Sequence, residues 1–152
     1  MHQLNDPSLL KTFSYINGSW HSSSSQIDVT NPATGELVSK VSNAGVEEAT
    51  LAVKAAKDAF SAWSKKPANE RAGLLRKWFD LMMENQEDLG RILTLEQGKP
   101  LAEAKGEIAY GAAFIEWFAE ESKRVYGDTI PGPSGDKRIV VIKQPIGVVA
   151  AI

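Results

Sequence analysis

The stretch Gln144-Pro145-Ile146-Gly147-Val148-Val149-Ala150-Ala151-Ile152 carries no charge and is apolar after Pro145. A short, continuous apolar run bounded by proline is typical of a parallel strand that is buried on both faces. In α/β folds the groups that bind ligands and do chemistry lie just beyond the carboxyl ends of such strands. We therefore expect an α/β fold in which residues 146–152 form the first strand of a dinucleotide-binding type of parallel sheet, with the chemistry beyond Ile152.

A second apolar run, Ile139-Val140-Val141-Ile142, lies just before this stretch. It follows a turn-rich connection that begins at Gly127, and basic residues flank it, so within residues 127–145 we expect one strand at a sheet edge. At roughly 1.5–3 kcal/mol for each large aliphatic side chain, burial of the two runs is worth on the order of 10–20 kcal/mol. That is comparable to the whole stability of a domain. We expect the partner strands to come from sequence that this chain does not contain.

Composition excludes several kinds of function. The 17 basic and 19 acidic residues give a net charge of −2 and are interspersed, so no basic surface for nucleic acid is expected. The sequence has no cysteine, so it offers no thiolate, disulfide or cysteine metal site. No apolar run approaches the roughly 20 residues that span a bilayer. We expect a cytoplasmic protein without a membrane partner.

The N-terminal part is predicted to contain a tail, residues 1–12, and a lead-in of two β-hairpins, residues 13–42. Asn17-Gly18 supplies the positive φ angles of a tight first hairpin. The turn Asn31-Pro32-Ala33-Thr34-Gly35 separates the two strands of the second hairpin. The serine run 22–25 between the hairpins is expected to be a flexible connection.

Residues 43–126 are predicted to be helical. Apolar residues from Val46 to Trp63 are spaced three and four apart, so this helix is expected to bury one face. A second helical stretch begins at Pro67, is broken near Asn85, and stops at Gly98. A third helix is expected from Pro100 to about Val125. It carries one apolar face with Ala104, Ile108, Gly111, Ile115 and Phe118 and another with Tyr110, Phe114 and Trp117, so it requires cover on two sides.

Few residues suggest chemistry by themselves. Gly98-Lys99 is not a phosphate loop, because the required earlier glycine and the following Ser or Thr are missing. Glu103 and Glu107 are four apart and are best explained as a solvated helix face. Both histidines lie near the N-terminus, so no catalytic residue and no metal ligand is proposed. The aromatic residues of the third helix either form core or wall an apolar pocket.

Five ordered motifs give a clearer indication. The run Leu95-Glu96-Gln97-Gly98-Lys99-Pro100-Leu101-Ala102-Glu103-Ala104, followed by Gly106-Glu107-Ile108, resembles the aldehyde dehydrogenase superfamily. Four other segments agree with it in order: Tyr15 to Trp20, Val29 to Gly35, Tyr126 to Pro131, and Pro145 to Val148. The sequence of residues 114–121 and 142–148 is most similar to the bacterial succinate-semialdehyde dehydrogenase branch.

The resemblance implies the opening third of an NAD(P)-dependent enzyme of GABA-degradation type that oxidises a semialdehyde to a carboxylic acid. Such enzymes use a cysteine thiolate, a glutamate base and an asparagine, none of which can be assigned in this chain. The resemblance implies that Ile152 contacts the cofactor and that Gly106, Tyr110 and Phe114 border the aldehyde tunnel. It also implies a homo-oligomer formed through a strand at 137–144. We expect the chain alone to bind no NAD or NADP and to be inactive.

Two other functions remain open at this point. One is a non-catalytic assembly module that joins a complete relative by adding its exposed strand. The other is a self-contained helical binding domain, which predicts a cooperative thermal transition without any partner.

Overall fold

The computed structural model describes residues 4–152. Its helices are a 3-10 turn, η1 (Pro7–Leu9), and four α-helices, α1 (Val46–Ser64), α2 (Ala68–Glu84), α3 (Gln86–Gln97) and α4 (Leu101–Glu121). Its strands are β1 (Ser14–Ile16), β2 (Ser19–His21), β3 (Gln26–Thr30), β4 (Leu37–Ser42), β5 (Asp128–Pro131) and β6 (Arg138–Val141). The strands pair in sequence as three separate antiparallel hairpins.

Both hairpins predicted in the lead-in are present. Asn17 and Gly18 have φ angles of 50° and 81°, which provides the tight turn between β1 and β2. Between β3 and β4, the Asn31 side chain accepts a hydrogen bond from the Ala33 amide at 2.9 Å, and Gly35 has a φ of 74°. Asn and Gly therefore occupy the turn positions that require a positive φ angle or a side-chain acceptor.

The helix boundaries follow the sequence signals closely. Asn85 separates α2 from α3, and Gly98 ends α3 with a φ of 80°. A Cβ atom at Gly98 would lie 2.8 Å from Cγ of Pro32, so the turn after α3 packs directly on the turn between β3 and β4. Two of the motifs that carry the family resemblance are thus in contact. The last helix ends at Glu121, four residues before the predicted end at Val125.

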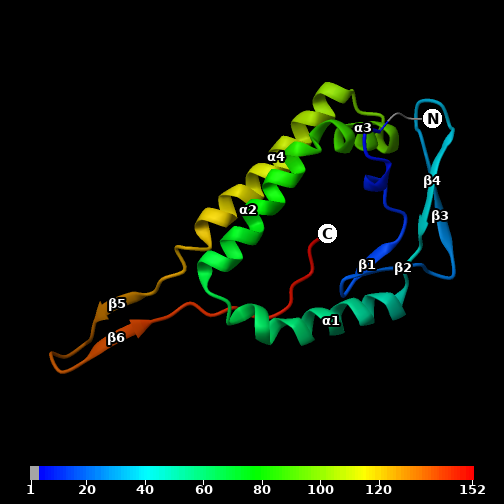
Figure 1. Ribbon diagram of the computed structural model, residues 1–152. Coiled ribbons are helices and arrows are strands. Elements are labelled where there is room, and N and C mark those ends of the chain that lie inside the picture. Colours follow the sequence, from blue (N-terminus) through cyan, green and yellow to red (C-terminus); the bar gives the residue numbers. More distant parts are fainter. Residues whose placement is uncertain (1–3) are drawn as a thin grey trace.

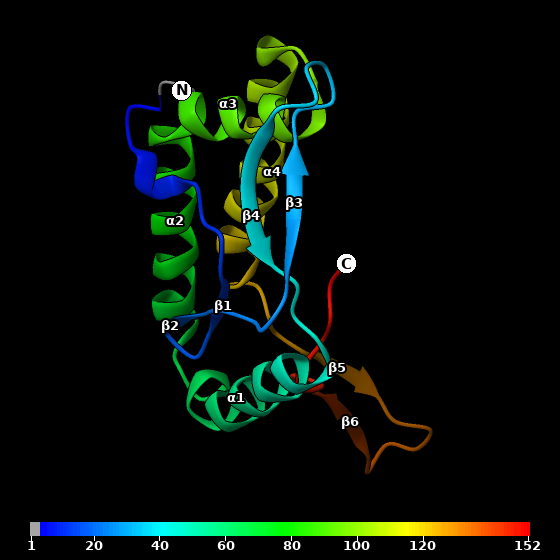
Figure 2. The same cartoon turned by 90° about the vertical axis from the view of Figure 1, so that its right-hand side faces the viewer.

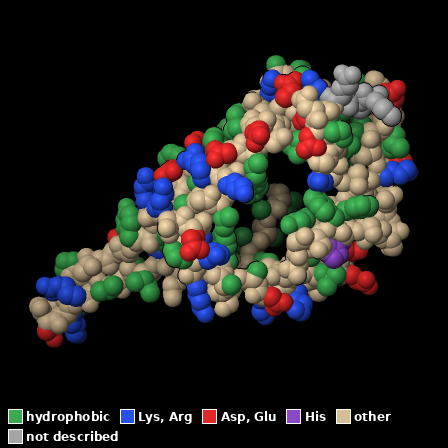
Figure 3. Space-filling view, viewed as in Figure 1, with side chains coloured by type: hydrophobic (Ala, Val, Ile, Leu, Met, Phe, Trp, Pro, Cys, Tyr) green, Lys and Arg blue, Asp and Glu red, His purple; other side chains and the backbone are tan. Residues whose placement is uncertain are grey.

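The elements surround an opening (Figure 1). α2 and α4 run antiparallel and side by side, and α3 crosses their upper end (Figures 1 and 2). The β3–β4 hairpin lies against α3, while β1–β2 lies against α1 on the opposite side. The space-filling view shows the opening with hydrophobic side chains on part of its rim, and the β5–β6 hairpin projecting from the body (Figure 3).

The interior consists almost entirely of small side chains. The buried hydrophobic residues are Ile16, Ala72, Ala104, Ala112 and Ala119. The prediction that α1 buries one face is wrong for the described chain, because Val46, Val53 and Trp63 on that face are 83%, 58% and 42% exposed. Among the described elements, α1 packs chiefly on the short strand β1, which is too small to cover a helix of 19 residues.

The region after α4 differs from the sequence prediction in two respects. β5 forms where only a turn-rich connection was expected, because Thr129 and Ile130 pair with Val140 and Ile139 of β6. Residues 146–152, predicted as a strand, have no strand pairing or backbone hydrogen bond to another described segment. A strand requires a neighbouring backbone, and no described element supplies one here. None of the helices within residues 4–152 is sufficiently long and apolar to cross a membrane.

Candidate functional site

The outer face of α4 gathers the aromatic residues that the sequence singled out. Tyr110 and Phe114 are four residues apart, and their rings meet edge to face with centroids 4.9 Å apart at 85°. Together with Ala113, Trp117 and Phe118 they line an open groove of about 320 Å³. Gly106 lies one turn before Tyr110 on the same helix, with open space where a Cβ would be.

One residue of this groove was assigned wrongly from the sequence. The sequence predicts Phe118 on the same face as Ala104 and Ile108, but Phe118 is 58% exposed and lines the groove beside Phe114. Residues 114 and 118 are one turn apart, so they follow each other along the same side of a helix. The helical spacing therefore contained the signal that would have found Phe118.

The inner face of α4 fixes the orientation of this groove. Ala104, Ala112 and Ala119 are at most 1% exposed, so the backbones of α2 and α3 approach α4 closely along this line. Large residues there would separate the helices. The aromatic side chains on the outer face of α4 are thereby held on the side that faces away from α2 and α3.

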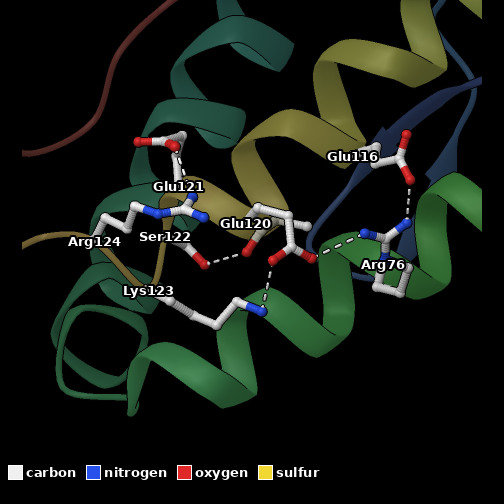
Figure 4. Close-up of polar contacts among 8 residues, drawn as sticks. Arg76, Glu116, Glu120, Glu121, Ser122, Lys123 and Arg124 are labelled. Atoms are coloured by element: carbon white, nitrogen blue, oxygen red, sulfur yellow. Dashed lines mark hydrogen bonds and ion pairs between the residues drawn. The ribbon is translucent and has the colours of Figure 1, made fainter.

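Polar contacts across one flank of the α2–α4 pair reinforce this packing (Figure 4). Arg76 of α2 donates to Glu116 at 2.5 Å and to Glu120 at 3.0 Å, both on α4. These two carboxylates raise the pKa of the Arg76 guanidinium. Hydrogen bonds from Lys123 and then Arg76 lower the pKa of Glu120. This cluster was not predicted from the sequence, where its only signal is the i, i+4 spacing of Glu116 and Glu120.

The groove contains no ionisable side chain apart from the Tyr110 hydroxyl. Glu107 of α4 instead forms an ion pair with Lys99, which precedes the helix, and this agrees with the interpretation of a solvated face. Within residues 4–152 no group of three His, Asp or Glu residues is arranged to hold a metal ion. Chemically, the groove provides an apolar wall for a ligand and no acid, base or nucleophile.

Ile152 is not brought to this groove. It lies at the end of the segment after β6, is fully exposed, and lines none of the cavities described in residues 4–152. The structure therefore groups Gly106, Tyr110 and Phe114 on one helix face and leaves Ile152 apart from them. The assignment of these residues to a tunnel and to a cofactor stays a prediction.

Comparison with known proteins agrees with the motifs. Glutarate-semialdehyde dehydrogenase of Pseudomonas putida is 59% identical over 152 residues, which cover 99% of this chain and 32% of that protein. Succinate-semialdehyde dehydrogenase [NADP(+)] of Escherichia coli is also 59% identical, with the same coverage of both chains. The chain thus spans about a third of the length of the curated relatives it matches.

Solved structures show the same architecture. The crystal structure of an aldehyde dehydrogenase from Brucella melitensis biovar abortus 2308 superposes with a TM-score of 0.93 at 53% identity, covering 95% of this chain and 30% of that one. The α/β arrangement described above therefore matches the N-terminal part of such a structure. The family model described as the aldehyde dehydrogenase family matches residues 20–152. The chain belongs to the aldehyde dehydrogenase family.

Proposed function

We propose that this chain forms the N-terminal part of an NAD(P)-dependent dehydrogenase that oxidises succinate semialdehyde, or a closely related acidic aldehyde, to the carboxylic acid. The observation that carries the proposal is the 59% identity to relatives named for succinate and glutarate semialdehyde. Both named substrates have an aldehyde at one end and a carboxylate at the other. The cytoplasmic location expected from the sequence stays a prediction.

In this proposal α4 supplies a wall of the aldehyde tunnel. The groove residues Tyr110, Phe114 and Trp117 are apolar or aromatic and carry no positive charge. They suit the methylene groups and the aldehyde end of the substrate rather than its carboxylate. The cation that binds the carboxylate is therefore expected outside this face of α4.

The chemical step requires groups that this chain does not provide. A thiolate nucleophile is excluded because the sequence has no cysteine. Residues 146–152 form no cradle for a dinucleotide among the described residues, and Ile152 alone offers only an apolar contact. NAD and NADP both remain candidates for the whole enzyme, and its homo-oligomer through residues 137–144 is likewise a prediction.

A hybrid enzyme tests the proposal. In it, this chain replaces the matching residues of the E. coli succinate-semialdehyde dehydrogenase. We expect the hybrid to oxidise succinate semialdehyde with kcat/KM within about tenfold of the parent. A folded hybrid that has lost activity, or that prefers aldehydes without an acidic group, would contradict the proposal. The isolated chain should give no reduced cofactor with succinate semialdehyde and NAD or NADP.

A variant of the hybrid tests the wall itself. Phe114→Ser removes the aromatic ring beside Tyr110, and we expect KM to rise about tenfold while kcat changes little, because the lost contact serves binding. Leu74→Ser is the matched control, since Leu74 is an exposed apolar residue of α2 outside the groove. Equal KM values in the two variants would remove Phe114 from the tunnel wall.

A second function, assembly with a complete relative, is favoured by one feature. The β5–β6 hairpin projects from the body, and every residue of both strands is exposed (Figure 1). A two-stranded ribbon with free edges is suited to strand addition. Co-purification of the chain with the tagged E. coli relative would support this function, whereas elution of the chain alone would count against it.

A further inference from the structure

The N-terminal segment is fastened to α3 by one carboxylate. Asp88 is 3% exposed, and its two oxygens accept three hydrogen bonds. Oδ1 accepts from the backbone N of Asn5 at 3.0 Å and from its side-chain Nδ2 at 3.1 Å, and Oδ2 accepts from the backbone N of Asp6 at 2.7 Å. A carboxylate that accepts several backbone hydrogen bonds is strongly held in its charged form.

The position of Asp88 in its helix makes this arrangement informative. It occupies the first turn of α3, where an acidic side chain commonly reaches back to cap its own helix. No side chain caps α3 at Asn85. All three of these hydrogen bonds come from a segment 82 or 83 residues away in sequence. The carboxylate therefore serves the N-terminal segment rather than the helix that carries it.

Residues 4–10, which we call the strap, are otherwise lightly attached. The Asp6 side chain accepts from the Ser8 amide at 2.9 Å and so caps η1 within the strap itself. The next backbone contact with the body comes after the strap, where Ser42 donates to Thr12 O at 2.8 Å. The strap runs from the first turn of α3 toward β1 as the dark blue segment in Figure 1.

The strap forms one wall of an apolar cavity of about 650 Å³. The strap contributes Leu4, Pro7 and Leu10, the β3–β4 hairpin contributes Glu36, Leu37 and Val38, and α3 contributes Ile92 and Leu95. The side chains that face each other across this cavity are mostly aliphatic. Displacement of the strap would therefore open the cavity without breaking the packing of α2 on α4.

We propose that the strap is a movable wall of this cavity and that Asp88 is the latch that holds it closed. Asp88 is a positioning residue in this device. Loss of its acceptor oxygens releases residues 4–10 and exposes Ile92 and Leu95, while the helices stay folded. The hydrogen bonds from Asn5 and then Asp6 lower the Asp88 pKa below its ordinary value of 3.8, so the latch remains charged and closed at neutral pH.

Amide hydrogen exchange on the 152-residue chain tests the latch. In Asp88→Asn the side chain keeps its shape but loses one acceptor oxygen, and we expect exchange at Asn5 and Asp6 to quicken about 10- to 100-fold. Exchange at Ala112, in the α2–α4 packing, should stay within about threefold of the parent. The matched control is Asp58→Asn, which removes an exposed carboxylate that pairs with Lys54.

Two outcomes would overturn the proposal: unchanged exchange at Asn5 and Asp6 in Asp88→Asn, or equal changes in the Asp58 control. If Asp88→Asn also loses protection at Ala112, the helices themselves are destabilised, and the variant Asn5→Pro then tests the latch. It removes both donors of Asn5 from the strap side and leaves α3 intact. Faster exchange at Asp6 with Ala112 still protected supports the latch, and continued protection of Asp6 refutes it.

Discussion

The inside and the outside of the helical layer are built from different residues. Where α4 meets α2 and α3, the buried positions of α4 are alanines, and Ala104 and Ala112 are 0% exposed. On the outer side of the same helix, Tyr110 and Trp117 are 68% and 65% exposed. Apolar stabilisation grows with buried area, so the fully buried alanines of α4 contribute little of it by themselves. Close backbone approach and the polar links from Arg76 add to the contacts of the half-buried apolar residues between the helices.

The strongest test of this difference fills the inner face. Ala112→Leu adds a branched side chain where no space exists, and we expect unfolding free energy to fall by roughly 1–3 kcal/mol. Urea unfolding followed by circular dichroism measures the change. Ala113→Leu, one position further and on the exposed groove, is the matched control and should be nearly neutral. Equal losses in the two variants would mean that the inner face is not tightly packed.

Tight packing can also be tested at the turn after α3, where Gly98 lies against Pro32. Gly98→Ala places a Cβ 2.8 Å from the Pro32 ring and requires a φ of 80°. Gly35 has a φ of 74° with no atom within 4 Å of a Cβ, so Gly35→Ala carries the backbone strain alone. We expect Gly35→Ala to cost about 1 kcal/mol and Gly98→Ala about 1 kcal/mol more. Chemical denaturation of both variants gives the difference, and equal losses would show that the Pro32 contact is unimportant.

Local features of this fold were predictable from sequence because they depend on local chemistry. The hairpin turn at Asn17-Gly18, the break at Asn85 and the stop at Gly98 each follow from backbone preferences of the residues involved. The exposure of the α1 stripe and the absence of a strand at 146–152 did not follow from sequence. Apolar periodicity shows which face a helix or strand offers, but not whether a partner is present to cover it.

The candidate site shows the same limit. The sequence grouped Tyr110, Phe114 and Trp117 correctly, because residues at helical spacing share a face. It did not find Arg76 or Asp88, whose partners are 40 and 83 residues away in sequence. Such long-range polar contacts depend on how helices and the N-terminal segment are placed. No local pattern reports that placement.

The polar link between α2 and α4 is expected to have a smaller effect than the packing changes. The pKa of Glu120 is lowered from 4.5, so its contribution to stability is present above pH 4.5 and is lost as pH falls through the lowered value. Glu120→Gln should reduce the urea midpoint at neutral pH, less than Gly98→Ala does, because these groups are part exposed.

The pH profile distinguishes this link from general packing. The difference between Glu120→Gln and the parent should shrink as pH falls from about 5 to about 3, because the parent then loses the same charge. Glu121→Gln, which breaks only the exposed pair with Arg124, is the control and should show little change at any pH. A difference that stays constant over this range would mean that the Glu120 charge does not stabilise the helix pair.

The smallest effect is expected on the outer face. Phe114→Ser in the isolated chain should change unfolding free energy by less than about 0.5 kcal/mol, because the ring is already 51% exposed and the two residues have similar helix propensities. Phe79→Ser on α2, where the ring packs beneath Arg76 with the guanidinium 5.3 Å from its centroid, should cost several times more. Urea titrations of both variants make the comparison.

If Phe114→Ser costs as much as Phe79→Ser, the aromatic face of α4 is buried in solution, for example against a second copy of the chain. Sedimentation of the parent protein would then show a dimer rather than a monomer.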